Sequence, residues 1–136
     1  MSSINPSRSR LESLVKQFAP DEPVVMLNLL RFREDAEYAD EDNESPCSGR
    51  EAYARYSKLA LNQLAKVEAR PEWVGEAMVP VIAPEDEDWD EVLLVRYPSA
   101  QAFLSMVSDP EYQAIVHHRT AALADSRLIA MRPKKT

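Results

Sequence analysis

The chain has 136 residues, of which 45% are hydrophobic and 29% charged, enough for one domain with a real core and too few for two. No apolar run is long enough to span a bilayer, and the N-terminal residues lack the apolar stretch of a signal peptide. A single cysteine, Cys47, excludes an internal disulfide and fits a reducing compartment. These features predict a cytoplasmic protein.

The net charge of −7 originates in one segment. Glu34–Glu44 holds seven of the 23 acids and no base, so the rest of the chain has 16 acids against 16 bases. Because no basic stripe is present, the sequence argues against binding to nucleic acids or to anionic membranes. We interpret the acidic run as a solvated loop. A calcium site is the alternative, although the run lacks the glycine and the alternating ligands of an EF-hand loop.

The first predicted element is a helix within residues 1–20, an extension that precedes the core. Its apolar residues recur at helical spacing, at Leu11, Leu14, Val15 and Phe18. Ser9–Glu12 matches a capping box, and the prolines of segment 20–23 end the helix.

The predicted core covers residues 23–132 of a single domain that spans 1–136. Apolar density indicates a buried first strand. A capping box opens a long helix after the acidic loop 33–47. A proline-containing run follows, which we interpret as a strand with a bulge at Gly75. After a third strand, Ser99 caps a helix that restarts at Asp109-Pro110-Glu111. The predicted elements are strand 24–32, helix 48–68, strand 72–83, strand 91–97, helix 99–124 and strand 126–132.

The order β-α-β-β-α-β predicts a ferredoxin-like α+β fold, with helices on one face of a four-stranded antiparallel sheet. The other face needs a partner, because strands such as Val92–Val95 are apolar on both sides. A second copy of the same sheet is the simplest partner. The sequence therefore predicts a homodimer that forms through the sheet faces.

Four segments resemble the domain of unknown function 1330 family. They occur in the family's order and are, in sequence letters, MLNLLRFR, GREAYARYS, WDEVLLVRYPSAQAFLSMVSDPEYQ and HHRTAALADSRLIA. The resemblance implies membership of the dimeric α+β barrel superfamily, which agrees with the topology derived above. The family's activity is not established.

The wider superfamily includes cofactor-free monooxygenases of aromatic polyketides, haem-degrading monooxygenases, muconolactone isomerases and chlorite dismutase-like proteins. In several of these, a pocket between sheet and helices is lined by an asparagine of the first strand and a histidine of the second core helix. By this analogy, Asn28 and either His117 or His118 are candidate catalytic residues.

The two histidines of the chain are adjacent. Neighbouring helical residues point about 100° apart, and neither histidine has a metal-ligating residue four positions away, so we expect no metal site. A helical wheel that starts at Tyr112 places His118 at the edge of the apolar stripe and His117 in solvent. His118 is thus either a hydrogen-bonded boundary residue or a proton carrier at the rim of a pocket.

Arg119 lies at the centre of the same apolar stripe. A guanidinium there needs a carboxylate, several carbonyls or an anionic ligand, so Arg119 is a candidate substrate-binding residue. Otherwise it forms an internal ion pair, or its stem snorkels past the sheet edge. Asn28 shares its strand face with apolar neighbours, and its amide either ties down backbone or offers donors to a ligand.

Three further residues complete the candidate substrate-binding set. Tyr53 and Tyr56 lie on the apolar stripe of the long helix, with hydroxyls that need partners. Arg96, near the end of its strand, is either an ion-pair member or an anion clamp. Because the chain has only two glycines and no phosphate loop, it has no Rossmann or P-loop cofactor site, and we expect no cofactor.

Two hypotheses of function remain open. The first is a cofactor-independent enzyme, similar to a monooxygenase or isomerase, that acts on a small organic molecule between sheet and helices. The second is a module that binds a small ligand or a protein without catalysis.

Overall fold

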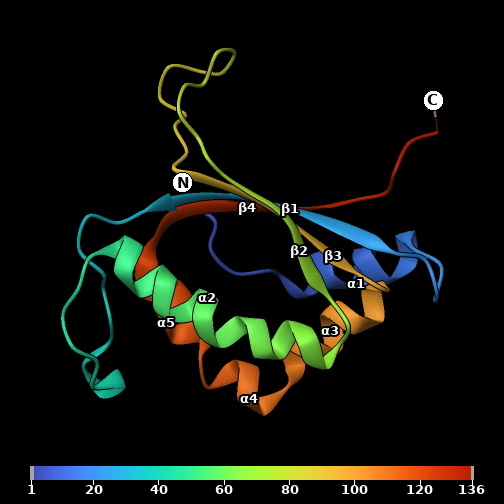
Figure 1. The fold of residues 1–136 in the computed structure, drawn as a ribbon, viewed down its shortest axis with the longest axis horizontal. Helices are drawn as coiled ribbons and strands as arrows, with labels where there is room; N and C mark the ends of the chain where they lie inside the picture. The colour runs from blue at the N-terminus through green and yellow to red at the C-terminus, as the bar shows by residue number, and fades with distance from the viewer. Residues whose placement is uncertain (1, 136) are drawn as a thin grey trace.

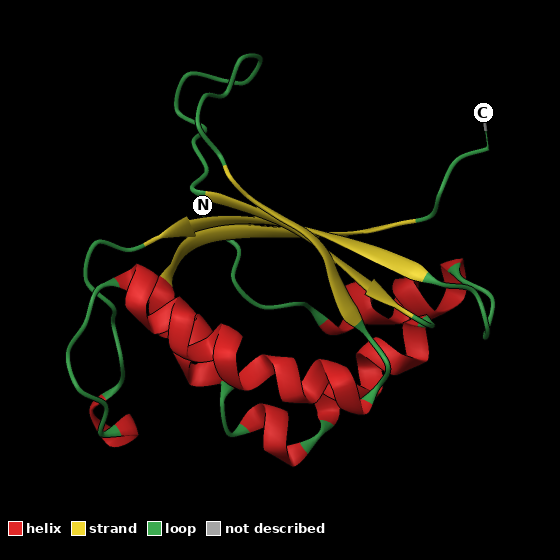
Figure 2. Cartoon of the chain, in the orientation of Figure 1, coloured by secondary structure: helices red, strands yellow, loops and turns green. Residues whose placement is uncertain are grey.

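The computed structural model describes residues 2–135, which form an α+β ferredoxin-like fold with the helices on one side of a four-stranded antiparallel sheet (Figures 1 and 2). This confirms the predicted fold class. The elements are α1 (Arg8–Gln17), β1 (Val24–Phe32), η1 (Asp40–Asp42), α2 (Gly49–Lys66), β2 (Arg70–Glu76), β3 (Glu91–Tyr97), α3 (Ala100–Ser108), α4 (Pro110–Gln113), α5 (Val116–Ala122) and β4 (Leu123–Met131).

The strand order is β2-β3-β1-β4, so the two apolar strands β1 and β3 occupy the centre of the sheet. In this register Asn28 of β1 stands opposite Leu93 of β3 and Leu128 of β4. Directly opposed residues share a face, and alternate residues along a strand change face. One face therefore carries Val24, Met26 and Leu30, which are almost fully buried beneath the helices.

Helix starts were predictable from their capping residues. Ser48 and Glu51 form the expected capping box, Ser99 caps α3, and Asp109 caps α4 with Pro110 in the first turn. The predicted N-cap of α1 was wrong by two residues. Ser7, not Ser9, accepts the hydrogen bond from the backbone N–H of Arg10.

The predicted strand 72–83 is too long. β2 ends at Glu76, and residues 77–90 form a loop that projects from the sheet on the side opposite the helices (Figure 1). A row of apolar residues suggested a strand, but Pro80 and Pro84 cannot donate to a sheet ladder. We name the apolar part of this loop, residues 78–82, the arm; its side chains Met78, Val79, Val81 and Ile82 are 72–96% exposed.

The predicted helix 99–124 is interrupted twice. It breaks at the Asp109-Pro110 cap, as the restart there anticipated, and again between α4 and α5, around Ala114 and Ile115. β4 then begins at Leu123, three residues earlier than expected. The register shift in β2 lies at Pro71–Trp73 and not at Gly75.

The acidic loop folds back against α5. The Glu37 N–H donates to the Ala121 carbonyl at 2.9 Å, and the Ala36 N–H to the Cys47 carbonyl at 2.9 Å. Our interpretation of this run as simply solvated is therefore incomplete, because its backbone is bonded to the helical layer. None of the helices within residues 2–135 is long and apolar enough to cross a membrane.

Candidate functional site

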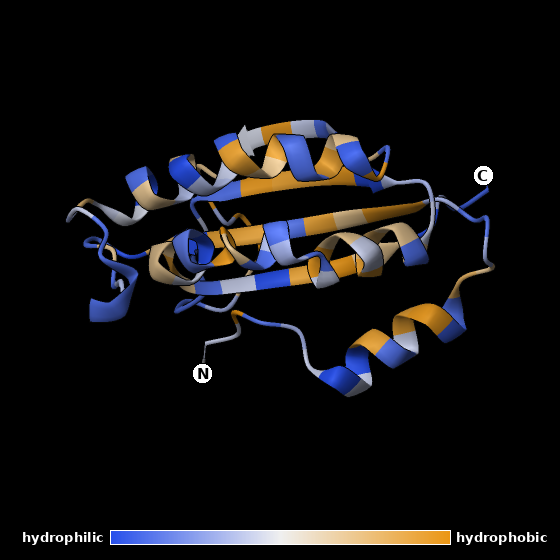
Figure 3. Cartoon of the chain, turned by 90° about the horizontal axis from the view of Figure 1, so that it is seen from below, coloured by the Kyte–Doolittle hydropathy of each residue, from blue (hydrophilic) through white to orange (hydrophobic). Residues whose placement is uncertain are grey.

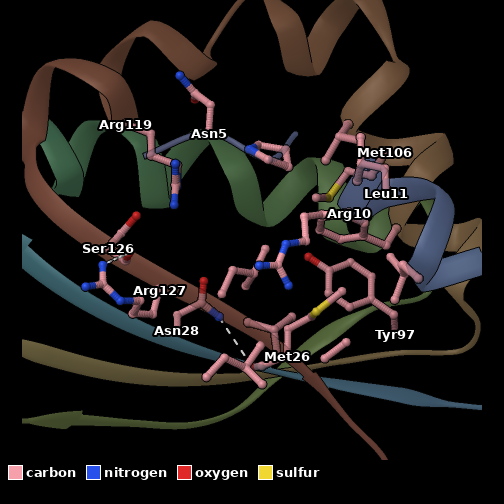
Figure 4. Close-up of a pocket in the computed structure, with 18 of the residues that line it drawn as sticks. Asn5, Arg10, Leu11, Met26, Asn28, Tyr97, Met106, Arg119, Ser126 and Arg127 are labelled. Carbon is pink, nitrogen blue, oxygen red and sulfur yellow. Dashed lines mark hydrogen bonds between the residues drawn. The ribbon is translucent and has the colours of Figure 1, made fainter. Parts of the chain in front are cut away.

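A cavity of about 1290 Å³ lies between the helix-facing side of the sheet and the helices (Figure 4). The N-terminal segment and α1 line it as well. In a view from the helix side, α1 lies apart from the other helices (Figure 3). Much of the cavity surface is apolar, with Met26, Leu93, Val95 and Ala130 on the sheet and Leu11, Leu14, Phe103 and Met106 on the helices.

The charged residues of the cavity are all of one sign. Four arginines line it, and no aspartate or glutamate does, among residues 2–135. This composition is the reverse of the whole chain, in which acids outnumber bases by 23 to 16. The lining arginines are Arg10, Arg119, Arg127 and Arg132.

Two of the four arginines are neutralised by carboxylates. Nη1 of Arg127 lies 2.7 Å from Oδ1 of Asp125, and Nε of Arg132 lies 2.6 Å from Oε2 of Glu22. The first pair lies within β4, and the second joins the segment after β4 to the segment before β1. They leave little charge for a ligand.

The other two arginines have no carboxylate partner. Nη1 of Arg119 donates to the carbonyl of Ile4 at 2.6 Å, and within residues 2–135 no carboxylate lies within 4 Å of its guanidinium. Arg10, from the first turn of α1, likewise has neither an ion pair nor a side-chain hydrogen bond to another described residue. The two extend toward the cavity from opposite sides, Arg119 near Asn28 and Ser126, Arg10 near Tyr97 (Figure 4).

Four tyrosines contribute the other polar groups. The hydroxyls of Tyr56 and Tyr112 lie 2.8 Å apart, and Tyr53 and Tyr97 also line the cavity. Burial raises the pKa of Tyr53, Tyr56 and Tyr97, and the positive charge of Arg119 offsets this only in part. These hydroxyls are therefore neutral hydrogen-bonding groups at physiological pH.

Asn28 lines the cavity and ties down backbone at the same time. Its Nδ2 donates to the carbonyls of Met26 at 3.3 Å and Leu93 at 3.2 Å, and two facing carbonyls fix the orientation of the amide. Both N–H donors are thus used. Of the two alternatives, the structure shows the amide that ties down backbone, and what Asn28 can still offer a ligand is its carbonyl oxygen, an acceptor.

Of the two alternatives for His118, the proton carrier at the pocket rim is wrong, because the residue does not reach this cavity, and the hydrogen-bonded residue is what the structure shows. His118 is 7% exposed and faces the acidic loop, with Nδ1 2.6 Å from the Tyr38 hydroxyl. His117 is partly exposed, at 27%, and is not simply solvated as expected, because its Nε2 lies 2.9 Å from Oε2 of Glu44. The same carboxylate oxygen lies 3.8 Å from Nε2 of His118.

The error has a structural cause. The helical wheel assumed one continuous helix from Tyr112, but the break at Ala114 and Ile115 resets the phase before His117. The expectation that adjacent histidines diverge is also wrong, since their rings lie 4.1 Å apart at an interplanar angle of 34°. Burial lowers the pKa of His118, and the hydrogen bond with His117 lowers the pKa of Glu44.

The remaining predicted residues lie on opposite sides of the sheet. Tyr53, Tyr56 and Arg119 line the cavity, as expected. Arg96 does not, because it stands between Val95 and Tyr97, which are both buried under the helices, and so points to the opposite face. Its placement in the substrate-binding set was wrong, and strand alternation could have shown this.

Sequence reasoning missed Arg10. The residue precedes Leu14 by one turn of α1, so it flanks the apolar stripe of that helix. This spacing was a usable signal. It was overlooked because the helix was interpreted as an extension outside the core.

Comparison with known proteins places the sequence in a family. A sequence model described as "Domain of unknown function (DUF1330)" matches residues 46–132, which is most of the chain. The chain belongs to the DUF1330 family. The predicted resemblance is therefore confirmed, while no curated protein matches the sequence.

Among solved structures, the DUF1330 chain is similar to the protein RPA0582 of unknown function from Rhodopseudomonas palustris. The two are 35% identical over 100% of both chains, with a TM-score of 0.90. Two more distant structures share the fold. A dimeric protein of unknown function with a ferredoxin-like fold from Bacteroides fragilis is 14% identical over 81% of this chain and 95% of its own, with a TM-score of 0.51. A hydroxynitrile lyase from Passiflora edulis is 13% identical over 86% and 98%, with a TM-score of 0.56.

Proposed function

We propose that the DUF1330 chain binds a small amphipathic organic anion in the cavity between sheet and helices. The observation that carries this proposal is that two of the lining arginines, Arg10 and Arg119, have no carboxylate partner among residues 2–135, in a cavity that no described acid lines and in a chain of net charge −7. A cavity of this sign inside an acidic protein favours an anionic group and disfavours a cationic one.

Arg119 and Arg10 are the proposed anchors of the anion. A guanidinium presents planar N–H donors that match a carboxylate or phosphate. Arg119 is half-buried and bound to a single carbonyl, so most of its donors are free for a ligand. Arg10 is exposed on α1 and lines the same cavity, so its donors are accessible to a ligand there.

The apolar surface determines the rest of the ligand. Sheet and helix residues around Met26, Leu93 and Met106 offer contact to a hydrocarbon or aromatic body. The volume of about 1290 Å³ exceeds that of a typical small-ligand site, roughly 300–1,000 Å³. An extended or multi-ring anion therefore fits better than a small acid such as acetate.

A cofactor-independent enzyme is the second candidate function. Arg119 and the Tyr56–Tyr112 hydroxyl pair line one cavity, where they would stabilise negative charge that develops on a substrate oxygen. Proton abstraction by His118 has no geometric support here, because that residue faces Glu44 and Tyr38. Any catalysis in this cavity would thus act through charge stabilisation by arginine and tyrosine.

We also propose that a second copy of the chain covers the outer face of the sheet. Leu27, Leu94, Trp73 and Ile129 lie on this face, where Trp73 is 56% and Ile129 48% exposed. The arm projects from the same side (Figure 1). An apolar sheet face beside an apolar arm favours burial against an identical surface, as a two-fold dimer requires.

The test is a binding screen that separates charge from shape. Long-chain and aromatic carboxylates are compared with the corresponding alcohols and amides, by calorimetry or thermal shift. The proposal expects binding of the anions only. Tighter binding of the uncharged analogues would contradict it.

Matched arginine variants locate the site. Arg10→Gln and Arg119→Gln should each weaken a bound anion about tenfold or more, since a charged hydrogen bond contributes about 1.5–3 kcal/mol. Arg8→Gln is the control, because Arg8 lies on the same helix but is 94% exposed and does not line the cavity. Equal affinity in all four proteins would place the ligand elsewhere. Chromatography of the ligand after incubation shows whether it is converted.

A further inference from the structure

We infer that Glu44, His117 and His118 form a binding site for one divalent transition-metal ion, of the Zn²⁺ class, at the junction of the acidic loop and α5. The site is separate from the proposed anion cavity, since none of the three residues lines that cavity. It brings the end of the acidic run together with the two histidines of the chain. Glu44 and His117 lie 73 residues apart in sequence.

Three ligand atoms converge. Oε2 of Glu44 lies 2.9 Å from Nε2 of His117 and 3.8 Å from Nε2 of His118, and one ligand atom from each residue lies within 4.8 Å of the others. A tetrahedral zinc ion with ligands at about 2.0–2.2 Å separates any two of them by roughly 3.3–3.6 Å. The observed separations lie on either side of that range, so small rotations of the side chains would complete the site.

The stacking of the two imidazoles makes this convergence possible. The rings are 4.1 Å apart and tilted by only 34°, so both Nε2 atoms point toward the same carboxylate. Two histidines and one carboxylate, with the remaining positions open, is a ligand set of catalytic zinc and non-haem iron sites. The side chains of His117 and Glu44 are 27% and 28% exposed, so an ion can enter from solvent.

Tyr38 supplies the supporting contact that a histidine ligand needs. Its hydroxyl lies 2.6 Å from Nδ1 of His118, and Arg55 donates to the same hydroxyl at 3.3 Å. A partner on Nδ1 fixes the orientation of the ring and directs Nε2 at the metal. Within residues 2–135, no lysine or arginine lies within 4 Å of the Glu44 carboxylate, so it is free to bind a cation.

The ligand types determine the class of ion. Imidazole nitrogen suits zinc, copper, nickel and iron, whereas calcium and magnesium require oxygen ligands. The neighbouring acids of η1 raise the local concentration of any cation without selecting one. Selection therefore rests on the two histidines.

Metal binding at this site would cross-link the acidic loop to the helical layer. His117 and His118 lie within the segment that matches the DUF1330 family, residues 46–132, and Glu44 lies just before it. The ion would join this acidic loop to α5, the helix that also carries Arg119. Metal binding would thus brace one wall of the proposed cavity.

Cobalt and zinc titration tests the inference, on chelator-treated protein without a histidine tag. We expect one Co²⁺ per chain with a visible absorption band, displaced by Zn²⁺. Because the chain has only two histidines, both imidazole ¹⁵N signals can be followed by NMR. Zn²⁺ should shift both sets of signals and raise the melting temperature.

The imidazole signals test the two histidines as ligands, and single-site variants test Glu44 as the third ligand and Tyr38 as the supporting contact. Glu44→Gln should weaken Zn²⁺ binding at least about tenfold, and Tyr38→Phe by about tenfold, as supporting contacts usually do. Glu41→Gln is the matched control, with the same change of charge in the same loop and no histidine contact. Absence of Zn²⁺ binding, equal affinity in Glu44→Gln, or equal binding of Ca²⁺ would each overturn the inference.

Discussion

Nη1 of Arg119 lies 2.6 Å from the carbonyl oxygen of Ile4 and so joins α5 to a segment 115 residues away. The neighbouring Ser3 bonds to β4 as well, with its N–H 2.8 Å from Oδ1 of Asp125 and its carbonyl accepting from Ser126. The N-terminal segment is therefore docked on the start of β4, where it lines the proposed anion cavity.

Replacing Arg119 should release this segment. In Arg119→Gln we expect faster hydrogen exchange at the amide of Ser3 and a loss of about 1.5 kcal/mol of unfolding free energy, near the lower end for a charged hydrogen bond. Exchange within α2 should not change. Arg8→Gln serves as the control, and unaltered exchange at Ser3 in Arg119→Gln would show that the β4 contacts hold the segment alone.

Gly49 is predicted to tolerate no side chain. A Cβ atom there would stand 2.1 Å from the carbonyl oxygen of Arg33 and 2.8 Å from that of Ala122, both backbone atoms that cannot turn aside. Gly49→Ala should therefore cost about 1–3 kcal/mol of unfolding free energy, as overpacking does. Gly75→Ala is the comparison, because the three atoms nearest to its new Cβ all belong to the movable ring of Trp73. Equal losses in urea denaturation would refute this account.

Local sequence patterns determined much of the fold. The caps at Ser48, Ser99 and Asp109 are short-range signals, since each side chain bonds to an amide two or three residues on. Apolar density in β1 and β3 identified the central strands because both faces are apolar. These features depend on residues close in sequence, which explains why they were predictable.

The candidate sites depend on chain paths that no periodicity encodes. Glu44 reaches His117 only because the acidic loop bonds back to α5, and the phase of α5 changed at a break that lacks a proline or glycine. Arg10 reaches the cavity because α1 crosses back beside the sheet. Arg119 was predictable because an unexplained charge on an apolar face is a local anomaly.

Acid should remove the contribution of Asp109, the cap of α4. Lys66 lies 2.9 Å from Oδ2 of Asp109 and holds the pKa of that carboxyl below its ordinary value of 3.8. A lowered pKa in the folded state stabilises the protein above pH 3.8, and the contribution is lost as pH falls through the folded value. Asp109→Asn keeps a capping side chain without the charge. The variant should be less stable than the wild type at pH 7, and the difference should vanish near pH 2 in urea denaturation; a constant difference would contradict the linkage.

A charge in the outer sheet face should separate the proposed dimer. Leu94 lies between Leu27 of β1 and Trp73 of β2, at the centre of that face. In Leu94→Asp, a carboxylate would be buried between two sheets beside Arg96 of the same face. Replacing an apolar contact with a buried ion pair costs about 1–4 kcal/mol, so we expect the dissociation constant of the dimer to rise at least about tenfold. Sedimentation equilibrium measures this dissociation constant, with circular dichroism to verify folding.

The control is Leu61→Asp on α2, a leucine that is 54% exposed on the helical side and should leave the dimer intact. Because the arm lies on the same side as the outer face, Ile82→Asp should weaken the dimer less than Leu94→Asp does. A wild-type protein that sediments as a monomer, or a Leu94→Asp dimer as tight as the wild type, would exclude a second copy as the partner of this face.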